Sequence, residues 1–397
     1  MNEPKIRFKE FKEGWKNVPF ASIAQRKVPS GLSGILPGIE YEDIISGEGK
    51  LNKNVYQKKD SKYGKLFSKG DVLFGKLRPY LKNILLAEFE GIAVGDFWVL
   101  HSDNVVPKFL FELVNSDRFM TVANISSGSK MPRSDWNLVS ETLFPMPEKA
   151  KEQELIGDSL SRFDELISTA TSRLASLKQV KEASLQAMFP QEGETVPKIR
   201  FKGFEGDWEK FKLYDCLEIS NERNQNNEYG VNEVLSVSDE EGVMNQIELL
   251  GRSYAGKSVA NYKILHKNQV VYTKSPLKAK PYGIIKVNKG NVGIVSVLYA
   301  VYDAKEGISP DYIHYYFSPT YRINNYLRPL INKGAKNTMN ISDNVALQGD
   351  IMLPNTLEEQ MEIVKLLQSL DKQITLQSQR LEKLKQIKAA CLGKMFV

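Results

Sequence analysis

The chain has 397 residues, of which 42% are hydrophobic and 26% are charged, as in ordinary globular proteins, so a disordered or fibrous chain is excluded. Two cysteines and three histidines, scattered along the chain, are too few for a zinc finger or a disulfide framework. The net charge of +6 allows nucleic acid as a partner without requiring it. No apolar run could span a bilayer, and the charged first residues do not resemble a signal peptide. We therefore expect a cytoplasmic protein with no membrane partner.

The two halves of the chain repeat each other. PKIRFKEFKEGW, at residues 4–15, returns as PKIRFKGFEGDW at 197–208, with eight of the twelve positions identical. A longer repeat aligns 147–189 with 354–396 without gaps. Between these segments the sequences diverge, apart from a faint echo of FSKGDVLFGK in LHKNQVVYTK. Because repeats define the units of a fold, this order predicts two divergent domains and two similar helical regions, at 1–147, 148–189, 190–353 and 354–397.

The first domain is predicted to be rich in strands. Short runs of Val, Ile and aromatic residues that are bounded by Gly and Asp, such as GDVLFG and GIAVGDFWVLH, are typical of strands. A helical pattern follows at 107–123, and a polar, basic loop that contains glycine, SSGSKMPRSDW, comes after it. The aromatic residues of the opening motif are predicted to anchor the packing of the domain.

The central region predicts one long helix. The pattern Pro-x-x-x-x-Glu-Gln at its start fits a turn before a helix, and apolar residues then recur with the alternating spacing of four and three that a coiled coil requires. The apolar seam consists of Ile156, Leu160, Phe163, Ile167, Leu174 and Leu177.

The second half has the same succession of elements. Strand-like runs, NQVVYT and NVGIVSVLYAVYD, precede a helical pattern at 310–327, a basic loop at 332–343 and another long helix. The seam of this helix consists of Ile363, Leu367, Leu370, Ile374, Leu381 and Leu384. Each long helix could instead lie on a globular core, but a narrow seam with a matched copy favours mutual pairing. The predicted fold class is α+β, with two domains of mixed β-sheet and flanking helices separated by a long antiparallel coiled coil.

One motif would indicate nucleotide binding. GRSYAGKS, from Gly251 to Ser258, matches the phosphate-loop pattern in every letter. A working loop needs a buried strand before it and a helix after it, whereas the flanking sequences here are polar and then extended. We therefore interpret the match as coincidental, and we find no methyltransferase motif, paired metal ligands or nucleophile elbow.

Together these features are similar to those of the specificity subunit of type I restriction-modification enzymes. The resemblance is based on the alternating domains and helices, the PKIRF motif that opens each half, the run GDVLFGKLRPYL at 70–81, the basic loops and the two helix starts, and it covers essentially the whole chain. It implies two target recognition domains, each reading one half of a bipartite, asymmetric sequence in double-stranded DNA. The helical pair would set the spacer between the half-sites and dock two methyltransferase subunits, with translocase-endonuclease subunits outside them.

The resemblance also implies that the chain alone is not an enzyme, although a type I site-specific deoxyribonuclease and adenine methyltransferase requires it. S-adenosylmethionine, ATP and Mg²⁺ are then expected in the partner subunits, and no cofactor or metal is expected in this chain. The other hypothesis is a structural coiled-coil adaptor whose two globular domains bind protein partners.

Residues that contact DNA should be cationic or polar side chains on loops. The candidates in the first domain lie in the KLRPYLK run and the basic loop: Lys76, Arg78, Tyr80, Lys82, Ser129, Lys130 and Arg133. Those in the second domain lie in the corresponding places: Lys274, Lys278, Lys280, Tyr282, Lys333, Lys336 and Asn337. Any one of them could instead be a solvated surface residue, so the clustering in both halves is the stronger signal.

Overall fold

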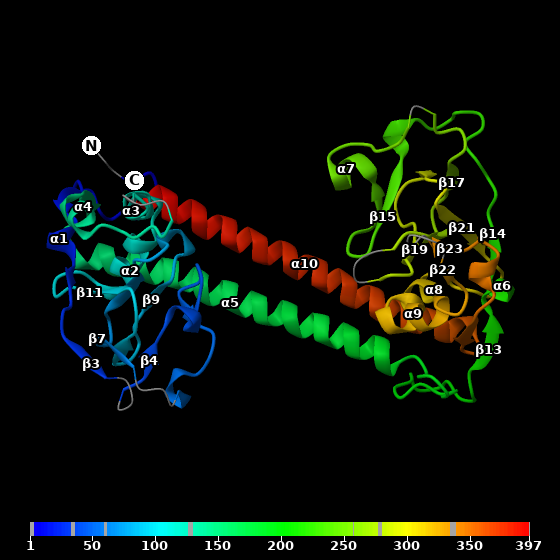
Figure 1. Cartoon of the computed structure of the whole chain (residues 1–397), viewed down its shortest axis with the longest axis horizontal. Coiled ribbons are helices and arrows are strands. Elements are labelled where there is room, and N and C mark those ends of the chain that lie inside the picture. The colour runs from blue at the N-terminus through cyan, green and yellow to red at the C-terminus, as the bar shows by residue number, and fades with distance from the viewer. Residues whose placement is uncertain are drawn as a thin grey trace. The chain divides into compact units, whose positions relative to one another are not determined.

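The structure is a computed structural model that describes residues 4–32, 36–58, 62–125, 130–256, 258–276, 280–333 and 339–396, with the side chains of 332, 333, 339 and 340 left aside. The chain forms two compact units. The first unit is made of Met1–Ser172 and Ser378–Val397, and the second of Arg173–Gln377. Each unit therefore contains one sheet domain together with parts of both long helices (Figure 1).

The first half of the chain forms short strands and helices, followed by the first long helix, whose last residues belong to the second unit. Its elements are β1 (Lys16–Pro19), α1 (Phe20–Ile23), β2 (Gln25–Arg26), β3 (Ser30–Leu32), β4 (Gly38–Ile39), β5 (Ile44–Ile45), β6 (Lys50–Leu51), β7 (Tyr63–Phe67), β8 (Val72–Gly75), β9 (Ile84–Leu86), β10 (Gly91–Ala93), β11 (Phe97–His101), α2 (Pro107–Asn115), α3 (Asp117–Ala123), α4 (Trp136–Glu141), β12 (Leu143–Met146) and α5 (Ala150–Ala187).

The second half of the chain repeats most of this order, and the last residues of its long helix belong to the first unit. Its elements are β13 (Glu209–Lys212), α6 (Leu213–Cys216), β14 (Leu217–Ile219), β15 (Leu235–Ser238), β16 (Gly242–Asn245), α7 (Gln246–Leu250), β17 (Lys263–Leu265), β18 (Val270–Thr273), β19 (Ile285–Val287), β20 (Gly293–Val295), β21 (Tyr299–Ala304), α8 (Pro310–Phe317), α9 (Thr320–Leu327), β22 (Asn332–Lys333), β23 (Met339–Asn340), β24 (Asp350–Leu353) and α10 (Leu357–Met395).

The central sheets of the two domains have the same topology. In the first domain the strand order is β2-β11-β8-β9, and in the second it is β14-β21-β18-β19, with every neighbouring pair antiparallel. The first strand of each domain also pairs with the last, as β1 with β12 and β13 with β24. The registers align the sequence echo, since Val72 pairs with Leu100 and Val270 pairs with Tyr302. The internal repeat therefore extends through the domains, and the α+β fold class is confirmed.

The long helices α5 and α10 run antiparallel to each other within each unit. In the first unit, Lys388 of α10 donates to Asp164 of α5 at 2.6 Å, and Ile156 lies in the same apolar core as Met395. In the second unit, Lys181 of α5 pairs with Asp371 of α10 at 2.5 Å. Because the repeat offset of 207 relates Lys181 to Lys388 and Asp164 to Asp371, each helix provides the same lysine and the same aspartate.

The predicted seam residues divide into two groups. The ends of the seam pack in the domain cores, because Ile156 and Leu160 belong to the core of the first domain, and Ile363, Leu367 and Leu370 belong to that of the second. Leu381 is buried, and the remaining seam residues are half-buried: Phe163, Ile167, Leu174, Leu177, Ile374 and Leu384. Helix-on-core and helix-on-helix packing, which the sequence analysis treated as alternatives, therefore occur along the same helices.

Two predicted helices are each interrupted. The stretch at 107–123 divides into α2 and α3, because Ser116 has an extended backbone and its hydroxyl accepts from the Phe119 amide, so it caps the second helix. The stretch at 310–327 divides into α8 and α9 at Pro319, which is the N-cap of α9. The apolar periodicity continues across both breaks, so the sequence pattern predicted one helix where the structure has two.

Candidate nucleic-acid interface

In the first domain, the two segments that contain the predicted DNA contacts are joined by their backbones. The KLRPYLK run connects β8 to β9, and the basic loop precedes α4. The Arg78 amide donates to the Pro132 carbonyl at 2.8 Å, and the Ser134 amide donates to the Lys76 carbonyl at 2.9 Å. Arg78 and Lys82 both have φ of 51°, on either side of a 3-10 turn at Pro79–Leu81.

The cations of these joined loops differ in whether they have a partner. Lys76 and Arg133 both pair with Asp96, at 3.3 and 3.0 Å. Burial alone would raise the pKa of Asp96, but hydrogen bonds from these two cations hold it below its ordinary value. The side chains of Arg78 and Lys130 are exposed and have no ion pair or hydrogen bond within the part of the chain that the structure describes. Two unpaired cations therefore lie on the joined loops.

The other candidates of the first domain are placed as follows. Tyr80 is 57% exposed at the tip of the 3-10 turn, with its ring available for contact. Lys82 is half-buried at the end of the same turn. Ser129 lies outside the described residues.

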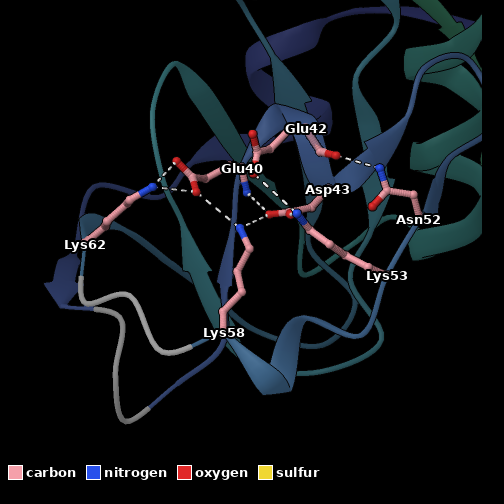
Figure 2. A network of polar contacts seen from close by, with 7 residues as sticks. All are labelled: Glu40, Glu42, Asp43, Asn52, Lys53, Lys58 and Lys62. Carbon is pink, nitrogen blue, oxygen red and sulfur yellow. Dashed lines mark hydrogen bonds and ion pairs between the residues drawn. The ribbon is translucent and has the colours of Figure 1, made fainter.

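Three other lysines of the first domain have acidic partners within the domain. Figure 2 shows Lys53, Lys58 and Lys62 directed at the carboxylates that flank β4, with Lys58 donating to the buried Asp43 at 2.5 Å. Lys62 donates to Glu40 at 2.8 Å. Burial would raise the pKa of Asp43, but the hydrogen bond from Lys58 contributes most to holding it below its ordinary value. These three lysines are paired with carboxylates of the domain, unlike Arg78 and Lys130.

In the second domain the described lysines of the equivalent run, between β18 and β19, both have an acidic partner. Lys274 pairs with Asp343 at 2.7 Å, and the buried Lys263 pairs with the same carboxylate. Tyr282 is half-buried against the core, and its carbonyl accepts from the Tyr272 hydroxyl at 2.8 Å. Lys278, Lys336 and Asn337 lie outside the described residues, and of Lys333 only the backbone, in β22, is described.

Lys280 requires a correction. Its side chain is only 7% exposed, and its ammonium donates to Asp239 at 2.8 Å and to the Ser318 carbonyl at 3.0 Å. It is therefore an internal structural cation and does not have the surface position that a DNA contact needs. The cause is Asp239, an acidic partner 41 residues away in sequence.

The motif GRSYAGKS has the reverse of the order that a phosphate loop requires. Helix α7 precedes it, Gly251 ends that helix with φ of 78°, and strand β17 follows it. Lys257 lies outside the described residues. The structure thus agrees with the interpretation of this match as coincidental.

The sequence analysis did not predict two buried ion pairs. One of them joins the first domain to α5, and the other joins the second domain to α10. Glu152 of α5 accepts from Arg7 at 2.7 Å and from the Trp15 indole at 3.0 Å. Glu359 of α10 accepts from Arg200 at 2.7 Å and from the Trp208 indole at 3.3 Å. The signal was present in the sequence, because the Arg and Trp belong to the repeated PKIRF motif and the glutamates belong to the repeated helix starts.

Two searches of the described residues bear on function class. No group of three or more His, Cys, Asp or Glu side chains is arranged to hold a metal ion within the described ranges. Among the same residues, no helix combines the length and the apolar character needed to cross a membrane.

Comparisons with known proteins agree on one family. Residues 205–386 match the family described as type I restriction modification DNA specificity domain. The EcoDI specificity subunit of Escherichia coli, a type I restriction enzyme component, is 28% identical over 91 residues, which are 23% of this chain and 20% of that protein. The chain thus spans about a fifth of the length of this curated relative.

Two solved structures share the fold over nearly the whole chain. One is the S subunit of a type I restriction-modification system from M. genitalium, with a TM-score of 0.58 and 12% identity, covering 100% of this chain and 99% of that one. The other comes from a study of complex assembly and conformational transition in the type I R-M system, with a TM-score of 0.52 and 20% identity, covering 98% and 99%. At these identities the likeness concerns the fold.

Proposed function

We propose that this chain is the component of a type I restriction-modification complex that reads DNA sequence, because residues 205–386 match the DNA specificity domain of that family and solved subunits of such systems share the fold. Each sheet domain reads one half of a bipartite, asymmetric site in double-stranded DNA. The helical pair sets the unread spacer and docks two methyltransferase subunits. Translocase-endonuclease subunits join outside them.

The observation that supports this proposal best is the contrast between the domains and the helices. The domains share a sheet topology but differ in the charges of the corresponding loops. The equivalent lysines pair with different aspartates, Lys76 with Asp96 and Lys274 with Asp343, and the joined loops of the first domain also have Arg78 and Lys130 exposed. The helices instead keep the same ion pair, Lys388 with Asp164 and Lys181 with Asp371. Domains that read different bases should diverge in this way, whereas helices that bind the same partner twice should not.

The proposal assigns no catalytic step to this chain. S-adenosylmethionine, ATP and Mg²⁺ belong to the partner subunits, where methyl transfer and DNA cleavage take place. The chain's own contribution is selectivity: cations and polar side chains on the loops contact phosphates and base edges, and the domain scaffold fixes their positions. The mild net charge of +6 suits a subunit whose partners share the neutralisation of the DNA backbone.

A domain exchange tests the proposal. Residues 1–147 are replaced by the corresponding domain of another specificity subunit, and the hybrid is expressed with the cognate methyltransferase subunit. Sequencing that detects N6-methyladenine should show a new base sequence in one half-site, with the other half-site and the spacer retained. An unchanged methylated motif would contradict reading by the first domain and would favour an adaptor role.

A further inference from the structure

A basic pocket in the first domain lies beside the joined loops and contains none of the predicted DNA contacts. It has a volume of about 390 Å³ and opens between β2, β7 and the start of α4, with Arg26, Lys27, Lys65 and Trp136 in its wall. This volume is sufficient for a partly hydrated phosphate group, because one water occupies about 30 Å³. Arg26 is exposed, and Lys65 and Trp136 are half-buried.

Two of the cations in this pocket have no acidic partner. The guanidinium of Arg26 lies over the Trp136 ring, 4.4 Å from its centroid, and this stacking leaves the N–H edge available. In the part of the chain that the structure describes, neither Arg26 nor Lys65 forms an ion pair. Burial lowers the pKa of Lys65, and repulsion from Lys76 and then Arg26 lowers it further. Lys27, by contrast, is paired with Asp71 at 2.8 Å.

The internal repeat provides a comparison within the same chain. The alignment of 67–76 with 265–274 places Lys65 at the position of Lys263 and Lys76 at that of Lys274. In the second domain a single carboxylate, Asp343, pairs with both of these lysines.

In the first domain the corresponding aspartate has a different role. The dipeptide Ser134-Asp135 matches Ser342-Asp343 when a gap of one residue is placed before the helix repeat, so Asp135 corresponds to Asp343 in sequence. Asp135 accepts from the Asn137 amide at 2.8 Å and so caps α4. Lys76 forms its ion pair with Asp96 instead, and Lys65 has no acidic partner among the described residues. The first domain also adds a cation, because the strand register places Ile219 of the second domain at the position of Arg26.

We propose that this pocket binds a phosphate group of the DNA backbone, whose oxygens interact with Arg26 and Lys65. In the second domain the equivalent of Lys65, Lys263, interacts instead with the Asp343 carboxylate. The inference rests on the proposed function and extends it, since it assigns a phosphate contact to the first domain. Such a contact positions the domain on the duplex and carries no base information of its own. The Trp136 ring holds the guanidinium in place for this contact.

The salt dependence of DNA binding tests this assignment. The complex of the chain with its cognate methyltransferase subunit is titrated with a mixed-sequence DNA duplex, by fluorescence anisotropy, between 50 and 200 mM salt. The variants are Arg26→Gln and Lys65→Gln. Each loss of one phosphate contact should make the slope of log affinity against log salt less negative by about 0.9. Arg26→Lys keeps the charge and should retain most of the slope.

Lys69→Gln is the matched control, because Lys69 is an exposed lysine before β8, at the opposite end of that strand from Lys76. It should leave the slope unchanged. Thermal unfolding of each variant checks folding, and the methylated motif should stay the same in all of them because no base contact is lost. If Lys65→Gln has the wild-type slope while the wild-type complex binds the duplex, the pocket assignment is overturned and DNA reading stands. If the wild-type complex binds no duplex, the proposed function itself is overturned.

Discussion

A buried carboxyl group beside the helical pair should make the protein less stable as the pH rises to neutrality. Glu112 of α2 is fully buried, and neither of its carboxylate oxygens has a hydrogen-bond partner among the described residues. The Lys388 ammonium is 3.7 Å away, too far for a hydrogen bond, and donates to Asp164 instead. Burial raises the pKa of Glu112 from 4.5 to about 7, against the attraction of Lys388.

The sign of the effect follows from linkage. Between pH 4.5 and 7 the folded protein keeps a proton on Glu112 that the unfolded chain has released, so the free energy of unfolding falls as the pH rises through this range. A shift of about 2.5 pKa units corresponds to about 3 kcal/mol. Glu112→Gln removes the titration and should therefore be more stable than wild type by about 3 kcal/mol at pH 8, but by only about 1 kcal/mol at pH 5.

Urea unfolding of the full chain and of Glu112→Gln, at pH 5 and pH 8, measures this difference. Glu90→Gln, at an exposed glutamate, is the control and should match wild type at both pH values. The second unit provides a natural analogue, since the equivalent position holds Tyr315, whose neutral hydroxyl donates to Asp371 at 2.7 Å. If Glu112→Gln were no more stable than wild type at pH 8, a folded state with an ionised Glu112 held by Lys388 would replace this explanation.

Two further predictions concern the helices. Glu359→Ala should lower the free energy of unfolding by about 3 kcal/mol or more, because it leaves the charge of the half-buried Arg200 unpaired; urea unfolding checks this, and a loss below about 1 kcal/mol would contradict it. Inserting one helical turn, about 6 Å, near Ala170 of α5 should lengthen the unread spacer and leave both half-sites unchanged; altered half-sites in the methylated motif would refute the spacer role.

The architecture was largely predictable because its strongest signals are local and repeated. The seam from Ile156 to Leu177 and its copy from Ile363 to Leu384 predicted two long helices, and helices α5 and α10 have 38 and 39 residues. Apolar runs bounded by glycine predicted the strands. The helix break at Ser116 was missed because the apolar spacing continues through it, and only the capping hydrogen bond reveals it.

The charge environment of the candidate site could not be predicted in the same way. Lys280 and Arg78 look alike in sequence, yet Asp239 neutralises the first from 41 residues away and the second is exposed. The unpaired Lys65 meets Arg26 and Trp136 only through the folding of β7, β2 and α4. Whether a cation has an acidic partner depends on which carboxylates the fold brings close to it, and these carboxylates are distant in sequence.

The most direct test of DNA reading by two domains is methylome sequencing of a host that expresses this chain with its cognate methyltransferase subunit. We predict N6-methyladenine in a single motif made of two short, different half-sites separated by a fixed number of unspecified bases, and no such methylation when this chain is omitted. A continuous motif, or the same methylation without this chain, would contradict the account.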